Sequence, residues 1–309
     1  MNNEQLTVVP LSANKNEYLT IEEFLKELAE QGLPLPRKQI DFRRKSGEIE
    51  RHPVLAELAF AKVKGFGSRL VIKKSDAVKY IERLKKQSVN ITYKDVKSVV
   101  ENYDQVMLKP ARAAMRQNRN FTGKIEDEVK GKLVEWGFAK YAYEKASLEL
   151  VIDFALITVT TRKRDEGDFI KCIVNGKDKN IPNELKISIK STSGNLLAVP
   201  EVETTWEGEW FVLAKLHIED KFLYDAIKAG FGLLELDFER NLGWFEIRGF
   251  VSKKDFTDTS KSYKGVNLPA PFTMDNNFSR DNYILIPTQL NQNPDDLISL
   301  LEKVKQAVS

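Results

Sequence analysis

The sequence predicts an α+β protein with a mixed sheet, and three observations support this fold class. Amphipathic helix patterns alternate with runs rich in β-branched and aromatic residues. From residue 121 onward the order is a helix, several strands, then a strand and a helix, which is typical of a mixed sheet flanked by helices. The length of 309 residues favours two domains, with three as the alternative.

Residues 1–90 are predicted to form a small N-terminal domain. In "TIEEFLKELAEQG", Thr20 and Glu23 have the spacing of a capping box, and Gly32 ends the helix. A short basic helix is expected in "RKQIDFRRKSG". A hairpin is expected in "AKVKGFGSRLVIKK", with its turn at Gly65 and Gly67, followed by a helix in "SDAVKYIERLKK".

This order of helix, turn, basic helix, hairpin and helix resembles a winged helix-turn-helix domain of the MerR or excisionase type over residues 18–88. The resemblance implies that the second helix enters the major groove and that the hairpin touches the DNA backbone. The residues implied at DNA are Lys38, Gln39, Arg43, Arg44, Lys45 and, in the hairpin, Arg69. Segment 51–62 is longer than the usual link, and a small helical packing domain is the alternative.

Positive charge is concentrated in one region. Residues 37–120 contain 21 Lys and Arg against 9 Asp and Glu, or +12, so the net charge of +3 leaves 3 − 12 = −9 for the remainder. This asymmetry indicates a polyanionic partner, most simply double-stranded DNA. Residues 91–120 are predicted as a helical basic connector, in which Arg112, Arg116 and Arg119 either follow phosphates or form a solvated face.

Composition restricts the chemistry and the compartment. His52 and His217 are the only histidines and Cys172 is the only cysteine, so a four-ligand Cys/His zinc site and an internal disulfide are excluded. Carboxylates and lysines would then carry any catalysis, with Mg²⁺ or Mn²⁺ as the suited ion and no organic cofactor. We expect a cytoplasmic location, because neither a long apolar span nor a signal-peptide pattern is present.

Residues 121–309 are predicted to form the second domain. "GKIEDEVKGKLVEWGF" indicates a helix ending at Gly137, and "LELVIDFALITVTTRK" a buried strand. A turn is expected at Asn175–Gly176. Later strands are expected in "GEWFVLAKLHIED" and "GWFEIRGFVS". The closing helix is marked by an apolar stripe of Leu297, Leu300, Leu301 and Val304.

A strand is predicted over "NELKISIKSTSGN", residues 183–195. Its alternation places Glu184, Lys186, Ser188 and Lys190 on one face, opposite Leu185, Ile187 and Ile189. Together with Glu126 in the preceding helix and Asp153 in "VIDFALIT", this segment resembles the PD-(D/E)XK nuclease superfamily, especially its Mrr-like branch and type II restriction endonucleases. The resemblance covers about residues 121–220 and implies an α/β/α core with a mixed central sheet.

The resemblance implies roles for individual residues. Asp153 and Glu126 would bind the metal, Lys190 would act on the attacking water or the phosphate, and Ser188 would hold a metal-bound water. The family usually has an acid at the position of Ser188, and Glu126 would replace it. The alternative register uses Glu184 and Lys186 instead, about 13 Å from Lys190 at about 3.3 Å per residue.

The sequence therefore predicts a metal-dependent endonuclease acting on double-stranded DNA, most simply a type II restriction endonuclease. Such enzymes usually dimerise so that two sites meet two strands, and we expect a homodimer. Two alternatives stay open. One is a DNA-binding regulatory protein with an inactive nuclease-like domain. The other is a repair or defence nuclease specific for DNA structure or modification.

Overall fold

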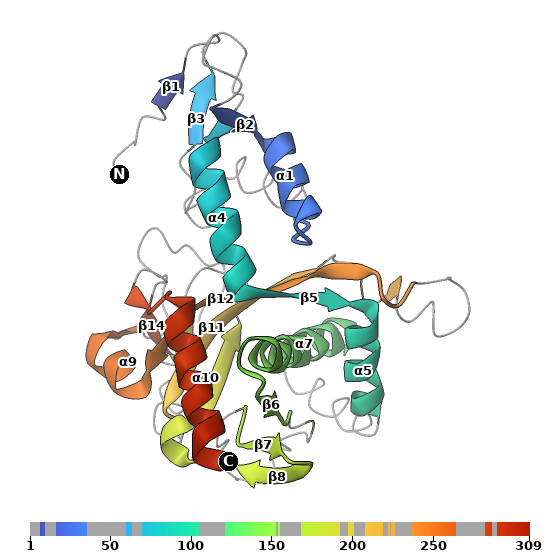
Figure 1. The fold of residues 1–309 in the computed structure, drawn as a ribbon, viewed down its shortest axis with the longest axis vertical. Helices are drawn as coiled ribbons and strands as arrows, with labels where there is room; N and C mark the ends of the chain where they lie inside the picture. The colour runs from blue at the N-terminus through green and yellow to red at the C-terminus, as the bar shows by residue number, and fades with distance from the viewer. Residues whose placement is uncertain are drawn as a thin grey trace. The chain divides into compact units, whose positions relative to one another are not determined.

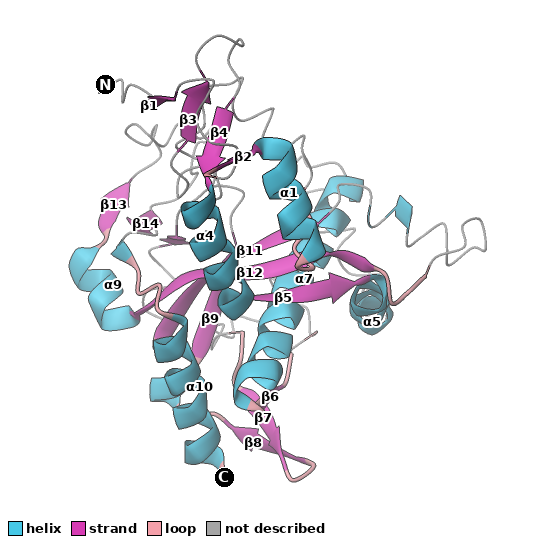
Figure 2. Ribbon diagram, turned by 45° about the horizontal axis from the view of Figure 1, so that its top comes forward, coloured by secondary structure: helices cyan, strands magenta, loops and turns pink. Residues whose placement is uncertain are grey.

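The computed structural model describes residues 7–9, 17–35, 60–63, 70–104, 121–152, 154, 168–191, 197–200, 208–218, 222, 224–225, 237–263, 282–285 and 289–309. Helices and mixed sheets make up these residues, so the predicted α+β class is confirmed (Figure 1, Figure 2). The chain divides into two compact units between Gln87 and Ser88, where the sequence suggested a domain boundary at residue 90.

The first unit contains a four-stranded sheet in the order β1-β3-β4-β2. Strand β1 is parallel to β3, and the other neighbours are antiparallel. The elements are β1 (Thr7–Val9), β2 (Tyr18–Thr20), α1 (Ile21–Glu30), β3 (Phe60–Val63), β4 (Leu70–Lys73) and α4 (Lys74–Gln87). Strands β3 and β4 pair as the predicted hairpin, and α4 is the helix predicted after it.

Helix α1 begins and ends as its sequence predicts. The Thr20 hydroxyl accepts from the Glu23 amide at 3.2 Å, and the Glu23 carboxylate accepts from the Thr20 amide at 2.7 Å. Gly32 has a φ of 78°, which reverses the chain after the last turn. The basic helix predicted at 37–47 lies outside the described residues.

The second unit is built on a four-stranded sheet in the order β5-β12-β11-β9. Strand β12 is antiparallel to both neighbours, whereas β11 and β9 are parallel, so the sheet is mixed. The strands are β5 (Ser88–Thr92), β9 (Ile187–Ser191), β11 (Trp210–Ile218) and β12 (Asn241–Ser252). Their alternate apolar residues face a core closed by helices α5 (Tyr93–Asp104), α7 (Phe121–Ala146) and α10 (Pro294–Val308).

Helix α7 contacts all four strands of this sheet, and α5 and α10 pack beside it (Figure 1). The prediction that this helix ends at Gly137 is wrong, because it continues to Ala146. A Cβ atom at Gly137 would lie 2.6 Å from Cγ of Phe245 on β12. Gly137 therefore allows close helix–sheet packing and does not act as a stop signal.

The helix expected in the basic connector belongs to the second unit. Asp95 in the first turn of α5 accepts from the Trp136 indole at 2.9 Å and from the Lys140 ammonium at 3.1 Å, and both donors lie on α7. Asp95 also caps its own helix, accepting from the Thr92 amide at 2.8 Å. This shared carboxylate joins β5, α5 and α7.

Two smaller sheets complete the unit, in the orders β6-β7-β8 and β10-β14-β13. Their elements, with the short helices, are β6 (Glu149–Leu150), β7 (Lys171–Val174), β8 (Lys177–Asn180), η2 (Asn183–Leu185), β10 (Leu197–Pro200), α9 (Lys253–Thr259), β13 (Lys261–Tyr263) and β14 (Asn282–Leu285). Asn175 and Gly176 have φ values of 52° and 70°, which confirms the predicted turn. Beyond β6, most of the strand predicted over residues 148–163 lies outside the described residues.

Candidate functional site

Strand β9 presents Ser188 and Lys190 on one face of the central sheet. Ile187 and Ile189 point into the core beneath α7, so the alternation predicted for these four residues is confirmed. Ser188 is buried and Lys190 is half-buried. In the parallel pairing with β11, Lys190 lies beside Leu213.

The beginning of the predicted strand is a 3-10 turn instead. Residues Asn183–Leu185 form η2, in which the Lys186 amide donates to the Asn183 carbonyl at 3.2 Å. Pro182 has a φ of −53°, and its ring supports this turn. Glu184 is exposed and Lys186 is buried, so strand alternation does not bring this pair together as the alternative register requires.

Asp168 is a candidate that sequence reasoning missed. The segment before β7 forms an antiparallel bridge between Phe169 and Ile187, and the Phe169 amide donates to the Ile187 carbonyl at 3.3 Å. The Asp168 carboxylate then accepts from the Ile189 amide at 2.5 Å. This carboxylate therefore lies at the edge of β9, level with the residue between Ser188 and Lys190. An acid immediately before the apolar run "FIKCIV" was the available signal.

The neighbouring strands β11 and β12 carry a buried ionic cluster. The His217 Nε2 atom lies 2.8 Å from one Glu246 oxygen, and Arg248 Nη1 lies 2.6 Å from the other. The His217 ring stacks on Trp244, with centroids 3.9 Å apart. Exposed fractions of 2%, 0% and 5% for His217, Glu246 and Arg248 make this the most enclosed charge cluster among the described residues.

The protonation states of this cluster follow from burial and charge. Burial favours the uncharged form of Glu246, but the Arg248 charge and the hydrogen bonds from His217 and Arg248 outweigh it and lower the pKa of Glu246 to about 2. Burial lowers the pKa of His217 despite its carboxylate partner. A neutral His217 must donate from Nε2, because an ionised carboxylate can only accept. Nδ1 then remains a buried acceptor with no hydrogen-bond partner among the described residues.

Alternation along the strands places these groups on the same side of the sheet as Lys190. We call this the polar face. It consists of Ser188, Lys190, Lys215, His217, Glu246 and Arg248. Lys190, Lys215 and Arg248 are its cations and Glu246 is its carboxylate, while His217 is neutral. Arg248 lies two strands from Lys190, or about 10 Å at the usual strand spacing.

The described residues supply only part of a metal site. Among them, no group of three or more His, Cys, Asp or Glu side chains is placed to hold an ion. Near Lys190, Asp168 and Ser188 provide hard oxygen donors of the type that Mg²⁺ takes. Asp153 lies outside the described residues. Glu126 lies within α7, but its side chain is not among those the structure describes.

The residues predicted to contact DNA all lie outside the described part of the chain. They are Lys38, Gln39, Arg43, Arg44, Lys45, Arg69, Arg112, Arg116 and Arg119. Their proposed role therefore stays a prediction.

No family model, curated protein or solved structure matches this chain. Within its described part, none of the helices has both the length and the apolar character needed to cross a membrane.

Proposed function

We propose that the protein is a metal-dependent endonuclease that hydrolyses phosphodiester bonds in double-stranded DNA, most simply as a type II restriction endonuclease. The arrangement at β9 carries this proposal. Lys190 and Ser188 share one face, and the Asp168 carboxylate binds the amide of the intervening Ile189. An ammonium and a carboxylate at one strand edge match the needs of phosphodiester hydrolysis, in which a water must be activated and extra negative charge offset.

In this proposal the Lys190 ammonium contacts the scissile phosphate or the attacking water. Asp168 fixes the edge of β9 by accepting from the Ile189 amide. Lys215, half-buried on the same face, would add positive charge beside Lys190. A bound Mg²⁺ would polarise the phosphate and lower the pKa of a water, and Asp153 and Glu126 would supply the carboxylates missing from the described donor set.

The N-terminal unit would deliver this site to DNA. The capped helix α1, the β3–β4 hairpin and helix α4 are consistent with a winged helix, and the strongly basic segment 37–47 would enter the major groove. A homodimer would bring two sites to two strands. We place this function in the cytoplasm, where a lone buried Cys172 stays reduced.

A DNA-binding protein that does not cleave is the second candidate. It is favoured by Ser188, which stands where an acid is usual in the family that the sequence resembles. A nuclease specific for DNA structure or modification would use the same chemistry on other substrates.

The register at β9 is testable with purified full-length protein, Mg²⁺ and genomic DNA prepared with and without methylation. We expect Lys190→Ala and Asp153→Ala to abolish cleavage, while Lys186→Ala leaves it within a few-fold of wild type. Loss of cleavage in Lys186→Ala but not in Lys190→Ala would move the site to Glu184 and Lys186. Binding without cleavage under every metal and methylation condition would establish the second candidate.

A further inference from the structure

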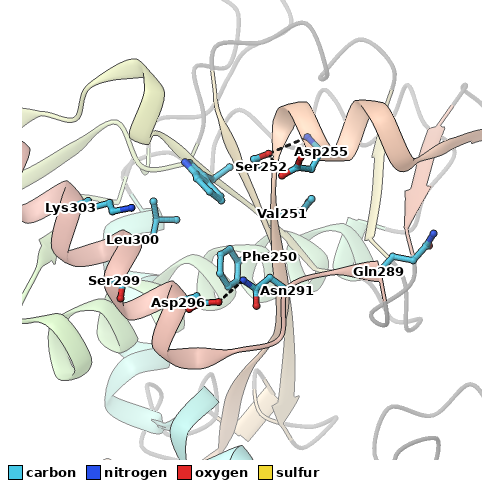
Figure 3. Close-up of a pocket in the computed structure, with 11 residues that line it drawn as sticks. Phe250, Val251, Ser252, Asp255, Gln289, Asn291, Asp296, Ser299, Leu300 and Lys303 are labelled. Carbon is cyan, nitrogen blue, oxygen red and sulfur yellow. Dashed lines mark hydrogen bonds between the residues drawn. The ribbon is translucent and has the colours of Figure 1, made fainter.

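A cavity of about 530 Å³ lies where β11 begins and β12 ends, beside α9 and α10 (Figure 3). Trp210 begins β11 and packs with the α7 core, whereas Lys190 faces away from that core. The cavity is bounded by the end of β12, the start of α9, residues 289–291 and one side of α10. None of Ser188, Lys190 and Asp168 is among the residues that line it, so it is distinct from the proposed cleavage site.

The floor of this cavity is apolar and partly aromatic. Trp210 and Phe250 have ring centroids 6.1 Å apart with planes at 44°, and Val251 and Leu300 continue the floor. Three of these four residues are buried, and Trp210 is half-buried. Such a floor suits a flat, largely apolar ligand that can pack against rings.

Hydrogen bonds within the protein hold the residues of this floor in place without a ligand. Phe250 and Asn291 exchange two backbone bonds, at 3.0 and 2.9 Å. The Trp210 indole donates to the Glu184 carbonyl at 3.2 Å. At Gly249 a Cβ atom would lie 2.7 Å from Leu290, so glycine lets segment 289–291 approach β12 closely. The cavity is thus preformed by backbone pairing and close packing.

The rim supplies acceptors and donors at separate points. Asp255 uses one oxygen to accept from the Ser252 hydroxyl at 2.6 Å, and Asp296 uses one to accept from the Asn291 side-chain amide at 2.9 Å. In Figure 3, Phe250 lies between Asp255 on α9 and Asp296 on α10. Each carboxylate has a second oxygen that can accept from a ligand N–H. Lys303 on α10 adds a donor on the same rim.

We propose that this cavity binds a nucleobase, presented as a free nucleoside or nucleotide. A base has a flat π-system for the aromatic floor, N–H donors for Asp255 and Asp296, and acceptors for Lys303. The volume lies in the range of sites for ligands of this size, about 300–1,000 Å³. A lone guanidinium or ammonium group would satisfy the carboxylates but leave most of the floor without a partner.

The test is equilibrium binding to the full-length protein by calorimetry and tryptophan fluorescence. The probes are adenosine, guanosine and cytidine, with agmatine as a cation that lacks a ring. We expect at least one nucleoside to bind with a submillimolar Kd and to quench fluorescence. Asp255→Asn and Asp296→Asn should each weaken it about tenfold, the usual effect of losing a charged hydrogen bond. Asp258→Asn, on the same helix as Asp255 but outside the cavity, is the matched control.

The location is tested separately with Trp210→Phe, which keeps an aromatic floor but should lose most of the quenching. Binding of agmatine without any nucleoside, or the lack of nucleoside binding at about 1 mM, the weak end of specific association, would overturn the proposal. It would also fail if both aspartate variants bound like wild type, or if Trp210→Phe retained full quenching. None of these results depends on DNA cleavage.

Discussion

Replacing Glu246 with glutamine tests the buried cluster on the polar face. The pKa of Glu246 falls from its ordinary value of 4.5 to about 2 in the folded protein. At about 1.4 kcal/mol per unit, the ionised form contributes about 3 kcal/mol to the free energy of unfolding at neutral pH. Removing one partner of a buried ion pair typically costs about 3–5 kcal/mol, because the other charge stays buried. We therefore expect Glu246→Gln to lower stability by about 3 kcal/mol.

The assay is urea unfolding at pH 7, followed by tryptophan fluorescence. All four tryptophans, Trp136, Trp206, Trp210 and Trp244, lie beyond residue 88, so the signal reports on the second unit. Glu239→Gln is the matched control, because Glu239 pairs with Lys94 at 2.9 Å on the exposed surface. The control should stay near wild type. If Glu246→Gln lost as little stability as Glu239→Gln, Glu246 would not be the ionised partner that stabilises the buried Arg248.

Other substitutions test packing and protonation. In the same urea assay, Gly137→Ala should lower the free energy of unfolding by about 1–2 kcal/mol, because the cost of overpacking against Phe245 exceeds the gain in helix propensity. The control is Gly131→Ala, whose added Cβ atom meets no atom within 4 Å. It should raise the free energy of unfolding by up to about 1 kcal/mol. Because burial lowers the pKa of His217, its contribution to stability is complete above about pH 6.5 and declines as pH falls. The stability advantage of wild type over His217→Gln should shrink as the pH falls from 7 to 5.5; a constant difference would argue against a buried neutral imidazole.

Local chemistry explains which elements the sequence predicted well. The capping box of α1, the Asn175–Gly176 turn and the apolar stripe of α10 depend on residues only a few positions apart. Helix α10 also begins after an Asn293 cap, and its stripe is buried as expected. Such signals are visible in one segment without knowledge of the fold.

Features that depend on distant segments were missed. Gly137 resembles a helix stop, and only the approach of Phe245, more than a hundred residues later, explains it. The pairing of His217 with Glu246 arises because β11 and β12 are neighbours. In sequence, "KLHI" and "FEIR" look like ordinary strands with exposed polar residues. The sequence alternates between polar and apolar residues from Glu184 to Lys190, but only its second half forms a strand and its first half forms a turn. A period of two in the sequence does not by itself require a strand.

The most direct test of the proposed function compares wild type with Lys190→Ala on the same DNA. With Mg²⁺, wild type should convert genomic DNA into discrete fragments, and Lys190→Ala should bind that DNA with similar affinity but leave it intact. Both proteins must be folded and bind DNA equally. If Lys190→Ala then fragments the DNA at the wild-type rate, the phosphodiester bond is not cut at Lys190 on the polar face, and the account is contradicted.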